Sequence, residues 1–156
     1  MNSSTNEPRV LGLDLGHTIY DNPKKQVFPD AFRVIRRLAL EVFKPENVHI
    51  VSRVTPEQEV RARKFIQSQE FQAKTGIPIE QAHFCAERHE KAPICLRLGV
   101  TVFVDDRPGV LVCMPPRIER VLFNPTEEDL RDYASAVQSM LIVQNWKEVE
   151  SLFFNT

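Results

Sequence analysis

The sequence has few cysteines, no long apolar run and no excess of either charge. Its three cysteines, Cys85, Cys95 and Cys113, are an odd number at wide spacing, so they indicate neither a disulfide framework nor a zinc knuckle. We expect reduced thiols, two of them in or near the core, and therefore a cytoplasmic protein. No apolar stretch approaches the roughly 20 residues of a membrane-spanning helix. The polar segment 1–8 also lacks the apolar run of a signal peptide.

The balance of charges limits the classes of partner. Lys plus Arg number 20 and Asp plus Glu number 21, which gives a net charge of −1. Such a chain has no overall field that attracts nucleic acid or an anionic membrane, although a local basic patch stays open. Hydrophobic residues at 42% and charged residues at 26% are ordinary globular usage and exclude collagen, a coiled coil and wholesale disorder. We predict a disordered or extended tail over 1–8 and a single domain over 9–156.

Short apolar runs alternate with longer amphipathic segments along the chain. The apolar runs predict strands at 10–13, 48–51, 81–85, 101–104, 121–123 and 140–143. Helical spacing predicts helices at 30–43 and 90–98, and one that starts at Thr55 and fades near 76–78. Two more are expected after the capping residues Thr126 and Asn145, the first of them extending to Val137.

Strand and helix in alternation predict an α/β fold in three layers. A mostly parallel sheet of five to six strands would lie between two layers of helices, in a Rossmann-like arrangement. The strands are apolar throughout, as expected where both faces of a parallel sheet are buried. The irregular segment 18–29 contains a turn at 22–25, which predicts a small hairpin flap.

Polar side chains follow three of the predicted strands at the point where each strand ends. These are Asp14, Ser52 and the pair Asp105 and Asp106, and Lys91 opens the helix after a further strand. The carboxyl ends of parallel strands lie along one edge of a sheet, where open α/β sheets bind their ligands. We therefore expect one crevice that holds three carboxylates, a hydroxyl and a lysine.

Carboxylates that lie close together need a counter-charge, because like charges raise one another's pKa. A magnesium ion supplies it, since Mg²⁺ prefers hard oxygen ligands. An aspartate in such a site can attack phosphorus and form an aspartyl-phosphate. Lys91 would then neutralise the nucleophile and the phosphoryl oxygens, and Ser52 would donate a hydrogen bond to them.

These residues resemble four motifs of the haloacid dehalogenase (HAD) superfamily, in the family's order. The run from Val10 to Thr18 resembles the first motif, an apolar run followed by Asp-x-Asp-x-Thr. Ser52 and Lys91 resemble the second and third motifs, and residues 102–106 resemble the fourth in its double-aspartate form. The resemblance spans about 10–111 and is closest to small, capless members.

The resemblance implies a role for each matching residue. Asp14 would be the nucleophile and a magnesium ligand, with the backbone carbonyl of Gly16 as a second ligand. Asp105 would coordinate the metal, and Asp106 would coordinate it or act through water. Thr18 would brace the loop after the first strand. Mg²⁺ would be the cofactor, and a phosphorylated molecule would be the substrate.

The sequence departs from the family at the second position of the first motif. Phosphatases of the family place an Asp two residues after the nucleophile, as acid and base for the leaving group, and here that residue is Gly16. Loss of a general acid typically slows a reaction about 10²–10⁴-fold. His17 could supply the proton, because its pKa suits the task. It is one position further along, however, and its side chain is expected to point elsewhere.

No cap domain fits into the gaps between the motifs, which a flap and a few elements already fill. Capless members of the family act on macromolecules or borrow a lid from an oligomeric partner. Trp146 and the pair Phe153 and Phe154 are expected to pack the terminal helix, although exposed aromatic residues there could form a homo-oligomer face.

Each of these residues also has an ordinary structural interpretation. Ser52 could be a turn residue and Lys91 part of a solvated face, and Asp residues such as 105 and 106 are common in turns. Arg53 and two further arginines, Arg88 and Arg107, follow strand ends and could bind a substrate phosphate, but salt bridges explain them equally well.

Two functions stay open on the sequence alone. The first is a magnesium-dependent HAD-type phosphohydrolase, weak because of Gly16. The second is a pseudophosphatase that binds phosphoryl groups or proteins without turnover. Displacement at carbon, as in dehalogenases, is disfavoured by the absent cap and the retained acidic pair. A phosphoreceiver domain is excluded, because its acidic pair precedes its phosphorylated Asp in the chain and here the order is reversed.

Overall fold

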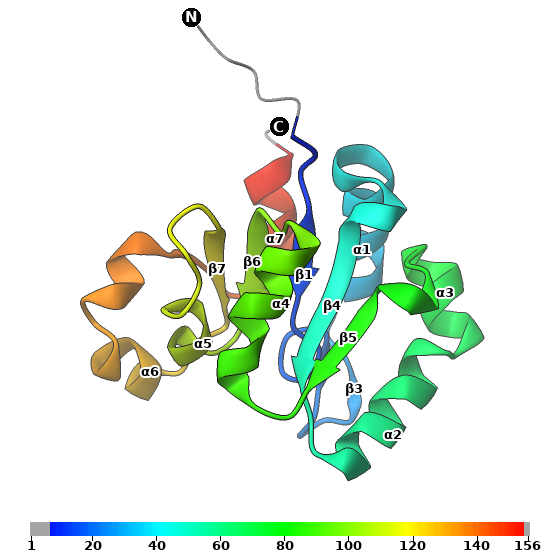
Figure 1. Ribbon diagram of the computed structural model, residues 1–156, viewed down its shortest axis with the longest axis horizontal. Helices are drawn as coiled ribbons and strands as arrows, with labels where there is room; N and C mark the ends of the chain where they lie inside the picture. The colour runs from blue at the N-terminus through cyan, green and yellow to red at the C-terminus, as the bar shows by residue number, and fades with distance from the viewer. Residues whose placement is uncertain (1–6, 155–156) are drawn as a thin grey trace, which may run out of the picture.

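The computed structural model describes residues 7–154, so the first six residues of the predicted tail lie outside the described range. Six parallel strands form one sheet in the order β5-β4-β1-β6-β7-β8 (Figure 1). The predicted three-layer, Rossmann-like α/β fold is confirmed, with six strands in the sheet. The strands are β1 (Leu11–Leu13), β4 (Val48–Arg53), β5 (Ala82–Cys85), β6 (Val102–Asp105), β7 (Glu119–Phe123) and β8 (Leu141–Val143).

Helices cover both faces of this sheet (Figure 1). The α-helices are α1 (Ala31–Leu38), α2 (Pro56–Ile66), α3 (Gln69–Thr75), α4 (Lys91–Leu98), α5 (Pro108–Leu111), α6 (Glu127–Asp132) and α7 (Trp146–Phe153). The end of α1 continues as a π-helical turn, η1 (Ala39–Phe43). Short 3-10 segments are η2 (Pro45–Asn47), η3 (Ile79–Gln81), η4 (Arg88–Glu90) and η5 (Ala136–Ser139).

Side chains that alternate along the strands build two separate cores. Leu11 and Leu13 of β1 pack with residues of α1 and α7, whereas Phe103 of β6 packs with residues of α4 and α5 on the other face. Gly12 permits this second packing, because a Cβ atom there would lie 2.5 Å from the Phe103 ring. The sheet is therefore buried on both faces, as its apolar strands predict.

Two predicted helices differ in the structure. The helix that begins at Thr55 is broken into α2 and α3 at Ser68, whose hydroxyl donates to the carbonyl of Phe65 and accepts from the amide of Phe71. The helix after Thr126 ends at Asp132 instead of reaching Val137. The backbone leaves helical geometry at Tyr133 (φ −118°, ψ 31°), and Val137 packs against the core from the 3-10 segment η5 instead.

Capping and terminal packing agree with the sequence. Thr55 forms the expected capping box with Gln58, and the Asn145 side chain accepts a hydrogen bond from the amide of Glu148. Trp146 is fully buried, and the ring of Phe153 packs edge-on against Phe43. All three cysteines are free thiols, of which Cys85 and Cys95 are buried, as predicted. Within the described range, no helix is long and apolar enough to cross a membrane.

The predicted flap is present. It is a two-stranded antiparallel hairpin of β2 (Tyr20–Asp21) and β3 (Gln26–Val27). The hairpin follows β1 directly and is the one insertion between β1 and α1, so no cap domain lies there within the described residues.

Candidate active site

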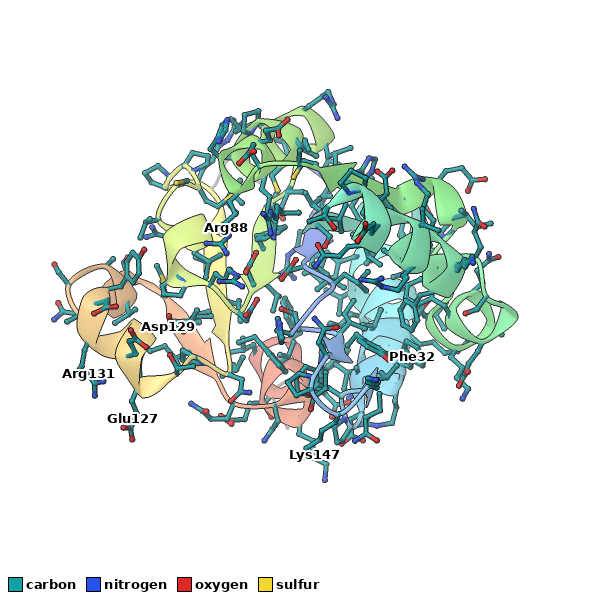
Figure 2. The ribbon with its side chains drawn as sticks, turned by 90° about the horizontal axis from the view of Figure 1, so that it is seen from below. Phe32, Arg88, Glu127, Asp129, Arg131 and Lys147 are labelled. Carbon is teal, nitrogen blue, oxygen red and sulfur yellow. The ribbon has the colours of Figure 1, made fainter. Side chains whose placement is uncertain are left out.

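The candidate site lies where the order of the strands reverses. β1 pairs with β4 on one side and with β6 on the other, and the chain leaves this sheet edge at Asp14 and Asp105. The amide of Asp14 donates to the carbonyl of Val104, which places the ends of β1 and β6 side by side. Figure 2 looks onto this edge from below. Crevices at such reversal points are the usual binding sites of Rossmann-like folds.

Lys91 joins the two aspartates. Its Nζ donates to Asp14 Oδ1 at 2.9 Å and to Asp105 Oδ2 at 2.8 Å, and all three side chains are buried. Burial by itself lowers the pKa of Lys91, but the negative charges of Asp14 and Asp105 outweigh it and raise the pKa above its usual value. The ammonium group is therefore charged and holds two carboxylates from different strands at one point.

A third carboxylate completes an acidic cluster. Asp14, Asp105 and Asp106 each have a carboxylate oxygen within 4.8 Å of one from the other two. Burial and the charge of Asp14 raise the pKa of Asp105 to about 6, with Lys91 opposing the rise. Burial and the charges of Asp14 and Asp105 raise the pKa of Asp106 to about 8. Among the described side chains, Asp106 Oδ1 is the one buried polar atom without a hydrogen-bond partner.

The donor set is suited to a hard divalent cation. When all three carboxylates are ionised they carry three negative charges and Lys91 returns one positive charge, so a divalent ion would balance the remainder. Oxygen ligands of this kind are those that Mg²⁺ and similar ions prefer. The unpartnered oxygen of Asp106 could serve as a further ligand atom for such an ion.

Neighbouring groups hold the two principal aspartates in position. The Thr18 hydroxyl lies 3.5 Å from Asp14 Oδ2, as expected for a brace on the loop after β1. The amide of Arg107 donates to Asp105 Oδ1 at 2.9 Å. Both contacts come from the chain just beyond the strands, so one side-chain hydroxyl and one backbone amide orient the two carboxylates.

A cavity of about 820 Å³ opens above the cluster. Six of the eight predicted site residues line it, and they come from β1 and its loop, β4 and α4. Asp105 and Asp106 are not among the lining residues, so the cavity reaches the cluster through Asp14 and Lys91. The six are Asp14, Gly16, His17, Ser52, Arg53 and Lys91.

His17 lies beside the cavity, against the expectation that it points elsewhere. Its backbone has φ 61°, and its amide donates to the carbonyl of Tyr20 at 2.7 Å. Its ring Nε2 lies 3.3 Å from Asn22 Nδ2, and both residues line the cavity. The left-handed backbone at His17 thus keeps its side chain at the cavity. The position of His17 in the sequence, one place after Gly16, did not indicate this.

The arginines beyond the strand ends are not used in ion pairs. Arg53, Arg88 and Arg107 all line the cavity, and none of them forms a salt bridge within the described part of the chain. Arg53 Nε donates to the carbonyl of Ala86 at 3.2 Å. Of the two interpretations open for these arginines, the structure does not support the salt bridges.

Sequence reasoning missed the part of the cavity formed by the flap and α2. Tyr20 and Lys25 come from the flap, and Arg61 and Phe65 come from α2. A signal existed for Arg61, because a helix capped at Thr55 begins at the sheet edge that carries the site, and its first turns stay near that edge. No pattern indicated that the flap folds toward the same helix.

Comparisons with known proteins concern the fold alone. No family model and no curated protein matches the chain. Among solved structures, it is similar to a de novo designed protein with the Rossmann 3x3 fold, studied by NMR in solution, with a TM-score of 0.50, 10% identity and 90% of each chain covered. The likeness agrees with the Rossmann-like architecture, and the chemistry must be inferred from the site.

Proposed function

We propose that this protein is a magnesium-dependent phosphohydrolase of the HAD type. It would hydrolyse a phosphate ester through an aspartyl-phosphate at Asp14, in the cytoplasm. The observation that supports this most is the Lys91 ammonium between Asp14 and Asp105, beside a third carboxylate and at the floor of a cavity. The order of the four motifs along the chain supports the same assignment.

The first half of the proposed reaction transfers the phosphoryl group to the protein. A carboxylate oxygen of Asp14 attacks phosphorus, the bond from phosphorus to the ester oxygen breaks, and that oxygen leaves as an alcohol after taking a proton. Lys91, Ser52 and Arg53 face the cavity and would bind the phosphoryl oxygens. Lys91 also holds the Asp14 carboxylate in position through its hydrogen bond of 2.9 Å to Asp14 Oδ1.

The second half restores Asp14. Water attacks phosphorus, the bond between phosphorus and the Asp14 oxygen breaks, and inorganic phosphate leaves. Magnesium held by Asp14, Asp105, Asp106 and the Gly16 carbonyl would supply positive charge for the phosphoryl oxygens. His17, which lines the cavity, would give the leaving oxygen its proton, and water is the alternative source.

A pseudophosphatase is the second candidate, and Gly16 is the observation that favours it. At this position the side chain of an Asp would serve as the general acid, and glycine has none. A Cβ atom at Gly16 would lie 3.3 Å from Asn22 Nδ2, the end of a flexible side chain, so an Asp there is sterically admissible. On this hypothesis the protein binds Mg²⁺ and phosphate without turnover.

One set of assays separates the two candidates. Phosphate release from a broad panel of phosphate esters is measured with Mg²⁺ and with EDTA. A phosphohydrolase shows metal-dependent turnover that Asp14→Asn abolishes and that Asp132→Asn, an exposed control on α6, leaves unchanged. Absence of turnover on the whole panel contradicts the first candidate. If the missing general acid is the cause of weak or absent turnover, Gly16→Asp should raise the rate of phosphate release on the order of 10²-fold over that of the wild-type chain.

A further inference from the structure

The cavity is far larger and more basic than one phosphate group requires. Its volume of about 820 Å³ is that of a site for a whole small molecule. Six basic residues and one acidic residue line it, although the chain as a whole has a net charge of −1. The basic residues are Lys25, Arg53, Arg61, Arg88, Lys91 and Arg107.

These cations converge from different parts of the fold. Lys25 lies in the flap, Arg61 in α2 and Arg88 in η4, and Arg107 follows β6. Figure 2 shows Arg88 over this edge, with the acidic side chains of Glu127 and Asp129 at the margin on α6. The positive charges therefore gather at the cavity.

Carboxylates do not neutralise this group. Apart from Lys91, none of the six basic residues forms an ion pair within the described range. Cations gathered in one concave site repel one another and raise the local concentration of anions. The planar guanidinium group of arginine can donate two parallel hydrogen bonds to the oxygens of one phosphate group.

We propose that the substrate of this site is a small molecule with at least one phosphate group besides the one that reacts. The inference rests on the proposed function, which assigns Lys91, Ser52 and Arg53 to the reacting phosphate. Four cations are then left to bind the further phosphate group or groups: Lys25, Arg61, Arg88 and Arg107. Tyr20 and Phe65, which meet edge-on with ring centres 5.6 Å apart, line the cavity and offer an apolar wall to the scaffold between the phosphates.

The distribution of charge favours a small polyanion over a nucleic acid. Binding along a nucleic acid backbone requires basic residues in a patch or stripe that extends over the surface. Here six basic residues line one concave cavity, whereas acidic residues outnumber basic ones in the rest of the chain. A sugar bisphosphate and a nucleoside bisphosphate share the chemistry that the cavity recognises.

Binding without turnover tests the inference. Calorimetric titrations of Asp14→Asn with Mg²⁺ compare fructose 6-phosphate with fructose 1,6-bisphosphate, and adenosine 5′-monophosphate with adenosine 3′,5′-bisphosphate. At least one bisphosphate is expected to bind about tenfold more tightly than its monophosphate. The pair that shows the larger ratio identifies the scaffold. The same titrations of the wild-type chain in EDTA replace these if Asp14→Asn does not fold.

Charge variants locate the second phosphate. In the same background, Arg61→Gln and Arg88→Gln should each weaken the bisphosphate about tenfold and leave the monophosphate unchanged. Arg131→Gln, at the outer margin of α6 in Figure 2, removes the same charge and should change neither. Equal affinity for the two members of both pairs, or equal weakening of both by Arg61→Gln, overturns the inference.

Three further outcomes test the small-molecule assignment and separate this inference from the proposed function. A 5′-phosphorylated oligonucleotide that binds more tightly than every bisphosphate overturns the small-molecule assignment. Turnover of monophosphates with no preference for bisphosphates leaves the phosphohydrolase intact and removes the inference. Selective bisphosphate binding by a chain that hydrolyses no ester supports the binding site and removes the phosphohydrolase.

Discussion

The indole Nε1 of Trp146 donates a hydrogen bond of 2.8 Å to the backbone carbonyl of Thr18, 128 positions earlier in the chain. The hydroxyl of Thr18 in turn lies 3.5 Å from the carboxylate of Asp14. The first turn of the terminal helix thus supports the loop that carries the proposed nucleophile. Both residues are fully buried, so water cannot replace this bond.

Trp146→Phe tests that support. The substitution removes the N–H donor and leaves a smaller ring in a fully buried position, so we expect the free energy of unfolding to fall by about 2–4 kcal/mol. Urea denaturation followed by circular dichroism measures it. Tyr133→Phe removes a hydroxyl from an exposed side chain and should change the stability by less than about 0.5 kcal/mol. A Trp146→Phe variant as stable as the wild type contradicts the role assigned to this bond.

Lys91→Met tests the ion pairs at the centre of the site. The variant keeps the length of the side chain but leaves Asp14 and Asp105 buried without their counter-charge, which typically costs about 3–5 kcal/mol. Thermal and urea unfolding in EDTA measure the loss, and added Mg²⁺ should restore part of it. Lys147→Met is the control, because Lys147 projects outward from α7 (Figure 2). Equal stability of the two variants would show that Lys91 does not balance these carboxylates.

Asp106→Asn tests the acidic cluster through pH. With a pKa raised to about 8, the folded wild-type chain keeps a proton that the unfolded chain releases above about pH 4. Its stability in EDTA should therefore fall as the pH rises from about 4 to 8, on the order of 2 kcal/mol more than that of the variant. Unfolding curves at pH 5 and pH 8.5 measure the difference. Mg²⁺ should stabilise the wild type at pH 8.5 more than the variant, and parallel profiles of the two would contradict the prediction.

His49→Gln tests a second buried group, with the opposite sign. His49 Nδ1 lies 3.1 Å from His83 Nε2 where β4 meets β5, and burial followed by the charge of His83 lowers the pKa of His49 to about 4. The unfolded chain therefore binds a proton below about pH 6.5 that the folded chain does not. Stability should be lost as the pH falls from about 6.5 to 4.

The expected loss between pH 7.5 and pH 5 is about 2 kcal/mol greater for the wild type than for His49→Gln. Urea denaturation at the two pH values measures it. His89→Gln, at an exposed position, should keep the wild-type dependence. If His49→Gln keeps it as well, His49 is not the group responsible.

The sequence predicted the structure correctly where the residue types of a segment match its burial in the fold. Strands β1 and β6 are apolar throughout because both faces are covered, and each ends at an aspartate. Their parallel pairing then brings Asp14 and Asp105 to one edge without further information. The break at Ser68 was missed because the amphipathic pattern continues across it, while a single hydroxyl decides where the helix stops.

The walls of the site were harder to predict than its floor. Arg61 and Lys25 reach the cavity only because α2 and the flap fold toward each other, a tertiary contact that leaves no periodic signal. The position of His17 depends on a left-handed residue, which side-chain patterns do not show. Residues at strand ends can thus be placed from sequence, whereas residues on the surrounding elements require the packed structure.

Lys91 also has a consequence for the order of folding and metal binding. The Lys91 ammonium supplies part of the positive charge that Asp14 and Asp105 require. These buried carboxylates are therefore partly neutralised even when no metal ion is bound. If the site binds Mg²⁺ as proposed, a newly synthesised chain would fold where divalent ions are scarce and bind one afterwards.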